Sequence, residues 1–134
     1  MDIDRLYGLA LEAASSSYSP YSKFRVGAAL LCASGKVYTG ANVENRSFGL
    51  TVCAERSAIS AAVSAGERDF EGIVVATPDA SYPVSPCGAC RQVLSEFLGP
   101  EAPVAFGASR GGVVRSTMGE LFPHDALHDL KGSS

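Results

Sequence analysis

Apolar residues near the start of the chain recur every three or four positions, at Ile3, Leu6, Tyr7, Ala10 and Ala14. This spacing places them on one face of a helix, which we expect to end at the serines 15–17. The mostly apolar run 25–33 then leads through Ser34 and Gly35 into residues 36–39, a pattern that predicts a β-hairpin. The chain therefore opens with a helix followed by two strands.

The middle of the chain predicts two more helices on either side of a buried strand. We expect one helix over residues 53–65, capped by Thr51, and another over residues 86–98, capped by Ser85. Between them, residues 73–76 are continuously apolar, which is typical of a strand covered on both faces.

The final third predicts a second hairpin and a short helix. Residues 104–106 and 113–115 have strand character, and the link 109–112 between them is too short for the crossover helix that parallel strands require. The last two strands should therefore be antiparallel. Thr117 begins a sequence typical of a capping box, which predicts a short last helix.

These elements predict an α/β fold, a three-layer α/β/α sandwich with one mixed five-stranded sheet. We expect a single domain over residues 1–130 and a loose tail over residues 131–134. The formal net charge of −3 disfavours a nucleic-acid partner. No apolar run approaches the roughly 20 residues that cross a bilayer, so we expect no membrane partner and a cytoplasmic location.

Three cysteines lie at the predicted starts of two helices. Cys87 and Cys90 are three residues apart, which places both sulfurs on one helix face at a spacing that suits two bonds to one metal ion. Cys53 begins the other helix, and helix N-termini favour the thiolate form. Both helices follow strands, at the edge where α/β sheets bind ligands. Three protein ligands would leave an open coordination position, which is typical of catalytic zinc.

Glu55 lies two residues after Cys53, within reach of a metal that Cys53 holds. Inside a helix, side chains two residues apart point about 200° away from each other. The hypothesis that Glu55 moves protons beside the metal therefore requires Cys53 to stand at the very start of its helix. The fourth cysteine, Cys32, lies in an apolar strand and is expected to be a buried hydrophobic residue, with a four-cysteine structural zinc site as the alternative.

Four segments of the chain carry a resemblance to a known family: Phe24-Arg25-Val26-Gly27-Ala28-Ala29, Asn42-Val43-Glu44-Asn45, Cys53-Ala54-Glu55-Arg56 and Pro86-Cys87-Gly88-Ala89-Cys90-Arg91-Gln92. Together they resemble a small homotetrameric cytidine deaminase over nearly the whole chain. The resemblance implies one zinc ion per chain and hydrolytic deamination of free cytidine or deoxycytidine to uridine or deoxyuridine, with release of ammonia, in pyrimidine salvage. It also implies a homotetramer whose subunits share active sites.

The resemblance implies roles for the residues near the metal. Cys53, Cys87 and Cys90 would hold zinc, and Glu55 would move protons from the attacking water to the base and to the leaving ammonia. Three thiolates leave the zinc site with a net negative charge, which weakens its ability to acidify water. Arg56 resembles a family arginine that hydrogen-bonds the thiolates, and we expect it to draw electron density from sulfur.

The resemblance also implies substrate contacts. Asn42 and Glu44 match ribose-binding positions, Phe24 matches the residue that packs against the pyrimidine, and the backbone of Ala54 would bind the edge of the base. In relatives that act on polynucleotides the last two strands are generally parallel, so the predicted closing hairpin favours a free nucleoside.

Two features depart from the family pattern. Phe48 stands where the family commonly has tyrosine, which removes a hydroxyl that could reach a neighbour's substrate. The phenylalanine expected to cover the base from another subunit has no clear equivalent, and either Leu127 or Phe122 would take its place.

Two other functions remain open at this stage. Cys87 and Cys90 also have the spacing of a thiol–disulfide oxidoreductase, although that hypothesis leaves Cys53 and Glu55 unexplained. A deaminase of a cytosine-containing antibiotic such as blasticidin S shares the same cysteine and glutamate motifs. The pair Asn42 and Glu44 favours a plain ribose instead.

Overall fold

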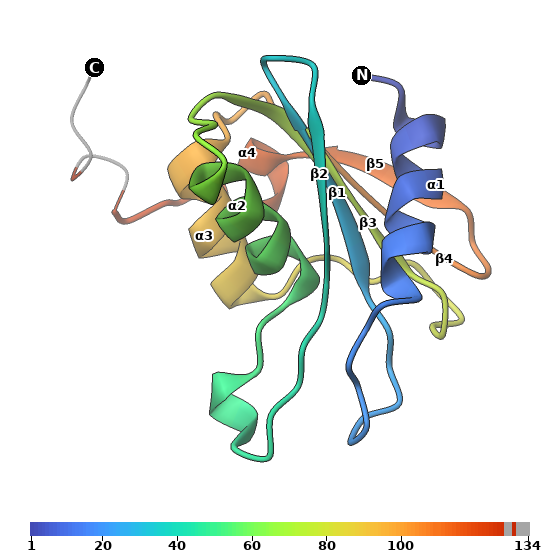
Figure 1. The fold of residues 1–134 in the computed structure, drawn as a ribbon. Helices are drawn as coiled ribbons and strands as arrows, with labels where there is room; N and C mark the ends of the chain where they lie inside the picture. The colour runs from blue at the N-terminus through green and yellow to red at the C-terminus, as the bar shows by residue number, and fades with distance from the viewer. Residues whose placement is uncertain (128–129, 131–134) are drawn as a thin grey trace.

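A five-stranded mixed sheet forms the middle layer of the structure, a computed structural model that describes residues 1–127 and Leu130 (Figure 1). The strands lie in the order β2 (Val37–Ala41), β1 (Gly27–Cys32), β3 (Phe70–Thr77), β4 (Pro103–Ala108) and β5 (Val113–Thr117). Strands β3 and β4 are parallel, and every other neighbouring pair is antiparallel. The predicted mixed sheet with an antiparallel last pair is confirmed, while the predicted tail over residues 131–134 lies outside the described residues.

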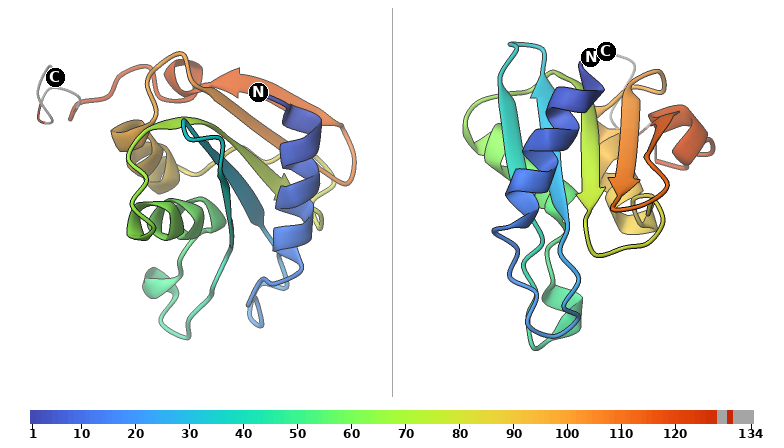
Figure 2. Two further views of the ribbon diagram at one scale, coloured as in Figure 1. Left: turned by 45° about the horizontal axis from the view of Figure 1, so that its top comes forward. Right: turned by 90° about the vertical axis from the view of Figure 1, so that its right-hand side faces the viewer.

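Helices cover both faces of this sheet (Figure 2). Helix α1 (Ile3–Ala14) packs on one face, and α2 (Ala54–Ser64), α3 (Gly88–Phe97) and α4 (Met118–Leu121) pack on the other. Alternate residues of β1 point into the two cores, so that Ala29 packs under α1 while Leu30 packs under α2 and α3. The predicted three layers are confirmed. In the part of the chain that the structure describes, no helix combines the length and hydrophobicity needed to cross a membrane.

Small residues set the distance between the layers. A Cβ atom at Gly27 would collide with the carbonyl oxygen of Ala10 in α1. On the other face, a Cβ at Gly40 would lie 2.5 Å from the nitrogen of Ala58 and 2.6 Å from the carbonyl oxygen of Ala54 in α2. These close approaches bring the first turn of α2 directly against β2.

The register of the strands brings several chain segments to one edge of the sheet. Gly27, the first residue of β1, pairs with Ala76 near the end of β3. The same residue pairs with Ala41, the last residue of β2. Helices α2 and α3 begin beside this edge (Figure 1). In open α/β sheets ligands bind outside the carboxyl ends of the strands, which makes this edge the expected location of the site.

The helices α2 and α3 begin later than the sequence analysis predicts. Their N-cap residues are Cys53 and Cys87, not Thr51 and Ser85. Thr51 instead ends the 3₁₀ helix Phe48–Leu50, and the backbone stays extended until Cys53. Neither cysteine makes a side-chain capping hydrogen bond. Cys53 and Cys87 therefore each stand directly before a helix, and the position of Cys53 meets the requirement that it lie at the very start of α2.

Candidate active site

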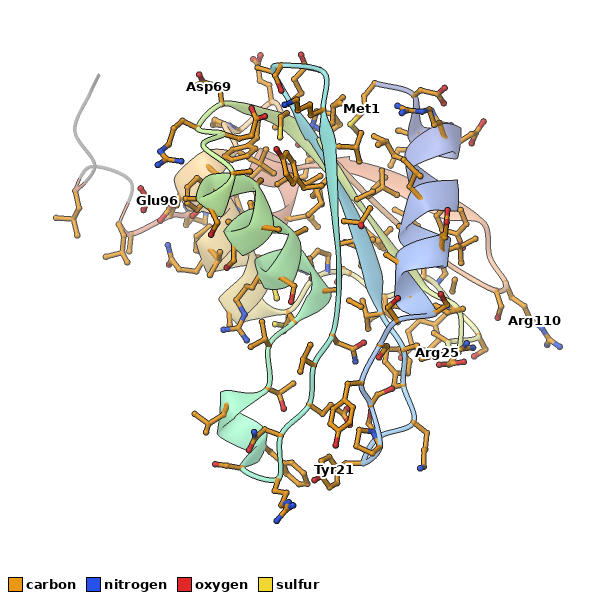
Figure 3. All side chains as sticks on the ribbon, viewed as in Figure 1. Met1, Tyr21, Arg25, Asp69, Glu96 and Arg110 are labelled. Atoms are coloured by element: carbon orange, nitrogen blue, oxygen red, sulfur yellow. The ribbon has the colours of Figure 1, made fainter. Side chains whose placement is uncertain are left out.

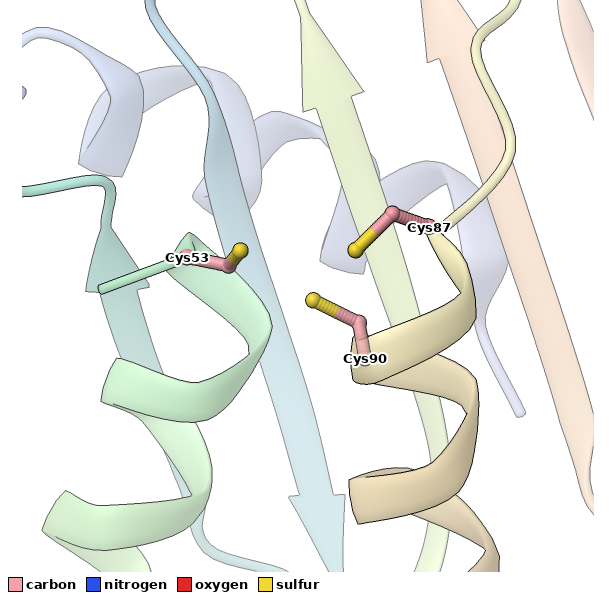
Figure 4. Close-up of side chains that lie close together, drawn as sticks. All are labelled: Cys53, Cys87 and Cys90. Atoms are coloured by element: carbon pink, nitrogen blue, oxygen red, sulfur yellow. The ribbon is translucent and has the colours of Figure 1, made fainter. Parts of the chain in front are cut away.

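Three cysteine sulfurs meet at this edge of the sheet (Figure 4). Cys53 precedes α2, Cys87 precedes α3, and Cys90 lies in the first turn of α3. Their Sγ atoms all lie within 4.8 Å of one another, and all three residues are free cysteines. Zinc–thiolate bonds of about 2.3 Å in tetrahedral geometry place sulfurs roughly 3.8 Å apart. The donor set and its spacing therefore fit a zinc ion.

Cys32 lies at the opposite end of β1 from this cluster. Its side chain is fully buried in the core between the sheet and α2, and burial raises the pKa of its thiol. Among the described residues, the group of potential metal ligands contains only the other three cysteines. The alternative of a four-cysteine structural site is therefore wrong, and the predicted buried position of Cys32 is confirmed.

Glu55 lines the same cavity as the three cysteines. The cavity has a volume of about 200 Å³, and only 4% of Glu55 is exposed. Burial raises the pKa of its carboxyl group. Cys53 has extended backbone angles, φ −72° and ψ 156°, and is not part of the helix. The two side chains can therefore reach one cavity although they are only two residues apart.

Arg56 contacts the cluster from outside the cavity. Its Nη2 atom donates a hydrogen bond to the carbonyl oxygen of Thr51 (2.9 Å) and lies 3.6 Å from Sγ of Cys53. Hydrogen bonding from the Cys90 thiol, followed by the Arg56 guanidinium, lowers the pKa of Cys53 to about 5. The same hydrogen bond, together with burial, raises the pKa of Cys90. The site thus favours a thiolate at Cys53.

Apolar side chains from three separate segments form the walls of the cavity. Phe24 and Val26 come from the chain before β1, Val75 from β3, and Val84 from the connection before α3. Thr77, at the end of β3, also lines the cavity and donates a hydrogen bond to a neighbouring carbonyl. The sequence analysis assigns a substrate contact only to Phe24 among these residues, although Val26 belongs to the same family segment. Val75, Thr77 and Val84 carry no motif, and only the fold brings them to the cavity.

Asn42 lines the cavity and is buried. Its Oδ1 atom accepts hydrogen bonds from the backbone nitrogen of Val26 (2.9 Å) and from the hydroxyl of Ser17. Its Nδ2 atom donates to the carbonyl oxygen of Phe24 (2.8 Å). In this structure, Asn42 therefore holds the segment that carries the phenylalanine.

Glu44 lies beside the cavity and is not one of its lining residues. Its carboxylate accepts hydrogen bonds from the backbone nitrogens of Tyr21 (3.0 Å) and Ser22 (3.1 Å) and from the hydroxyl of Ser22. The hydroxyl of Ser22 is the main cause that lowers the pKa of Glu44. Ser22 in turn accepts a hydrogen bond from the backbone nitrogen of Phe24 (3.0 Å).

The residues that depart from the family pattern lie on the surface or at the edge of the core. Phe48 is 72% exposed and makes an edge-to-face contact with Tyr21, with ring centroids 5.8 Å apart. Leu127 is 50% exposed, and Phe122 packs partly buried against the core near α4. The suggested contacts of Leu127 or Phe122 with a neighbouring subunit remain predictions.

Three sulfurs and a buried glutamate share one cavity, and comparison with known proteins identifies the family. A family model described as the cytidine and deoxycytidylate deaminase zinc-binding region matches residues 1–105. The chain belongs to this family. Within the deaminase family, the cytidine deaminase of Sporosarcina psychrophila is 45% identical over 123 residues, which cover 92% of this chain and 90% of the relative.

Two further relatives refine the comparison. The crystal structure of cytidine deaminase from Burkholderia pseudomallei has a TM-score of 0.87 and 43% identity, and covers 92% of this chain and 98% of that chain. The blasticidin-S deaminase of Bacillus cereus is 36% identical over 109 residues, or 76% of each chain. Family membership and the cysteine cluster together confirm zinc as the predicted cofactor, one ion per chain. They leave no support for a thiol–disulfide oxidoreductase.

Proposed function

We propose that this chain catalyses the zinc-dependent hydrolytic deamination of free cytidine or deoxycytidine to uridine or deoxyuridine, with release of ammonia. The observation that carries the proposal is the buried carboxyl group of Glu55 in one cavity with three sulfur ligands. The cytidine deaminases of S. psychrophila and B. pseudomallei, which match this chain over nearly all of their length, support the same substrate.

The chain's own residues would move the protons of this reaction. Zinc, when bound to the three cysteines, supplies the Lewis acidity that makes water a better nucleophile at neutral pH. Glu55 would take a proton from the attacking water and deliver it to the ring nitrogen of the base. It would then transfer the second proton of that water to the amino group, which leaves as ammonia. Because Glu55 is buried, bulk water does not compete for these protons.

Arg56 would compensate the negative charge of the three thiolates. Its Nη2 atom already lies 3.6 Å from Sγ of Cys53. Its Nε atom is a buried donor that has no hydrogen-bond acceptor among the described residues. A guanidinium beside the sulfurs draws electron density from them and so strengthens the Lewis acidity of the site. Arg56→Gln should therefore lower both turnover and zinc retention.

The cavity offers a place for each part of the nucleoside. The flat pyrimidine would pack against Phe24, and the backbone N–H of Ala54 at the start of α2 would bind the edge of the base. The ribose hydroxyls would use the hydrogen-bonding capacity that remains on Asn42 and Glu44. A carboxylate has about four acceptor positions, and three of those on Glu44 are occupied, by Tyr21 and Ser22.

We propose further that the substrate is a free nucleoside and that the protein assembles as a homotetramer. The antiparallel pair β4 and β5 and the net charge of −3 support a free nucleoside over a polynucleotide. The family resemblance implies a homotetramer in which Leu127 or Phe122 covers the base of a neighbouring subunit, and the exposed Phe48 and Leu127 are available for such contacts. Light scattering tests this assembly. We also propose a cytoplasmic location, where a reducing environment would keep all four cysteines as the free thiols of this structure.

Ammonia release tests the function directly. Zinc-loaded protein is supplied separately with cytidine, deoxycytidine and blasticidin S. We expect release from the two nucleosides, and Glu55→Gln should lose at least about 10²–10⁴-fold in turnover while it retains one zinc per chain. Activity on blasticidin S alone would replace the proposed substrate with the antibiotic. Silence with all three compounds would refute the proposal, and full activity of Glu55→Gln would refute the role of the glutamate.

A further inference from the structure

The cavity wall that carries Phe24 lies outside the regular sheet. Pairing of β1 with both neighbours begins at Gly27, so residues 24–26 precede the strand. Figure 3 labels Arg25 at this point, where the chain approaches β1. A wall of this kind keeps its shape only if other groups satisfy its backbone.

Residues that follow the two neighbouring strands satisfy the backbone of this wall, and the backbone nitrogen of Asn42 itself donates a hydrogen bond to the carbonyl oxygen of Val26 (3.2 Å). In the sheet, β1 lies between β2 and β3. Asn42, directly after β2, binds the carbonyl oxygen of Phe24 (2.8 Å) and the nitrogen of Val26 (2.9 Å). Asp79, in the connection after β3, accepts a hydrogen bond from the nitrogen of Arg25 (2.8 Å). The two side chains thus continue the sheet's hydrogen bonding where its strands end.

Asp79 also holds the side chain of Arg25. The guanidinium donates two hydrogen bonds to the carboxylate, from Nε to Oδ2 (3.0 Å) and from Nη2 to Oδ1 (2.7 Å). The connection that carries Asp79 is itself anchored, because the carbonyl oxygen of Ala80 accepts a hydrogen bond from the hydroxyl of Ser109 (2.8 Å). Arg25 lowers the pKa of Asp79 to about 2, so the carboxylate is charged at neutral pH.

We propose that Asp79 is a positioning residue for substrate binding: it holds the backbone and side chain of Arg25 and thereby fixes Phe24 at the wall of the cavity. An exposed ion pair contributes little to stability, so the effect of Asp79 lies in where it holds the wall. The part of this inference that concerns substrate rests on the proposed function, in which Phe24 packs against the base.

The first test reports on the wall without any substrate. The chain contains no tryptophan, so Phe24→Trp introduces a single tryptophan, excited apart from the five tyrosines, into the wall of the zinc-loaded protein. In that background, Asp79→Ala should increase quenching of the tryptophan by acrylamide, because the wall becomes more mobile. The matched control is Glu67→Ala. It removes the same charge and also one exposed hydrogen bond, from the hydroxyl of Ser34 (3.0 Å), and should leave quenching unchanged.

The second test measures the kinetics with Phe24 intact. Asp79→Ala should raise KM for cytidine by about two- to tenfold, the range that one aromatic contact contributes, with little change in kcat. Arg25→Ala keeps the backbone hydrogen bond to Asp79 and should show a smaller effect. Asp79→Asn, which retains one acceptor for the Arg25 nitrogen, should recover part of the loss.

The outcomes separate this inference from the proposed function. If Asp79→Ala and Glu67→Ala give the same quenching, Asp79 does not position the wall, whatever the kinetics show. If quenching increases while KM stays unchanged, the wall does not contribute to substrate binding and the inference is overturned. If no form of the protein deaminates cytidine, the proposed function fails, and the quenching experiment still decides whether Asp79 holds the wall.

Discussion

Arg91 provides a direct test of how the structure holds the backbone that leads into Cys87 at the start of α3. Arg91 lies in α3, and its half-buried guanidinium donates three hydrogen bonds: from Nε to the carbonyl oxygen of Pro86 (2.7 Å), from Nη1 to that of Leu121 (2.7 Å) and from Nη2 to the hydroxyl of Ser85 (2.9 Å). One side chain therefore joins the residue before Cys87 to the end of α4. The sequence analysis predicts that Ser85 caps α3. In the structure Ser85 instead accepts a hydrogen bond from Arg91.

Arg91→Met keeps most of the aliphatic stem and removes all three donors. Hydrogen bonds to a charged group contribute about 1.5–3 kcal/mol each, and water replaces part of them at this half-buried position. We therefore expect the free energy of unfolding to fall by about 2–4 kcal/mol. For a domain of this size, this corresponds to a decrease of roughly 7–14 °C in Tm. Zinc should also pass faster to a chelator, because the backbone before Cys87 is no longer held.

The assay is thermal and urea unfolding at saturating zinc and one fixed protein concentration, since bound ligands and assembly both shift apparent stability. The control is Arg68→Met. Arg68 donates two comparable hydrogen bonds, to the carbonyl oxygens of Val63 (2.9 Å) and Glu67 (2.8 Å), but it is exposed and far from the metal. Arg68→Met should lower the free energy of unfolding by no more than about 0.5 kcal/mol. Equal losses in the two variants, or equal rates of zinc release, would refute the reasoning.

Three further predictions concern packing, metal binding and pH. Gly27→Ala should lower the free energy of unfolding by at least about 1–3 kcal/mol because its Cβ would collide with α1, and urea unfolding that matches the unsubstituted chain would contradict this. Cys32→Ala should keep one zinc per chain whereas Cys87→Ala should lose it, as measured by metal analysis after dialysis; zinc loss from the first variant would show that the ligand set is wrong. Because Arg25 lowers the pKa of Asp79 from 3.8 to about 2, the small stabilisation by this exposed ion pair is present above pH 3.8 and is lost as the pH falls through 2. The stability difference between the unsubstituted chain and Asp79→Asn should therefore close over that window, and a difference that stays constant would count against the pair.

The order of helices and strands follows from local patterns. The closing hairpin is predictable because the link 109–112 is too short to hold a crossover helix. This limit depends only on the number of residues in the link. The exact boundaries of the helices and strands also depend on contacts with distant parts of the chain. The apolar run beginning at Arg25 predicts a strand, but pairing begins only at Gly27, since Asn42 and Asp79 hold the residues before it.

The metal site is predictable to a similar depth. Spacing places Cys87 and Cys90 on one helix face, and the requirement that Cys53 precede its helix follows from helical geometry alone. The backbone angles of Cys53 meet that requirement. Sequence spacing does not show that Asn42 is already hydrogen-bonded to the chain around Phe24, because that contact joins residues 18 positions apart.

Hydrophobic periodicity and cysteine spacing depend on neighbours along the chain, and they predicted the layers and a candidate three-cysteine metal site, whereas the chemical class came from the resemblance to cytidine deaminases. Contacts between distant segments depend on how the layers pack, and these only the tertiary structure decided. Val75, Thr77 and Val84 became cavity walls, and Asp79 became a partner of Arg25, because the edge of the sheet brings separate strand ends together. No local pattern encodes such a meeting, since each side chain finds its partner only after the backbone has folded.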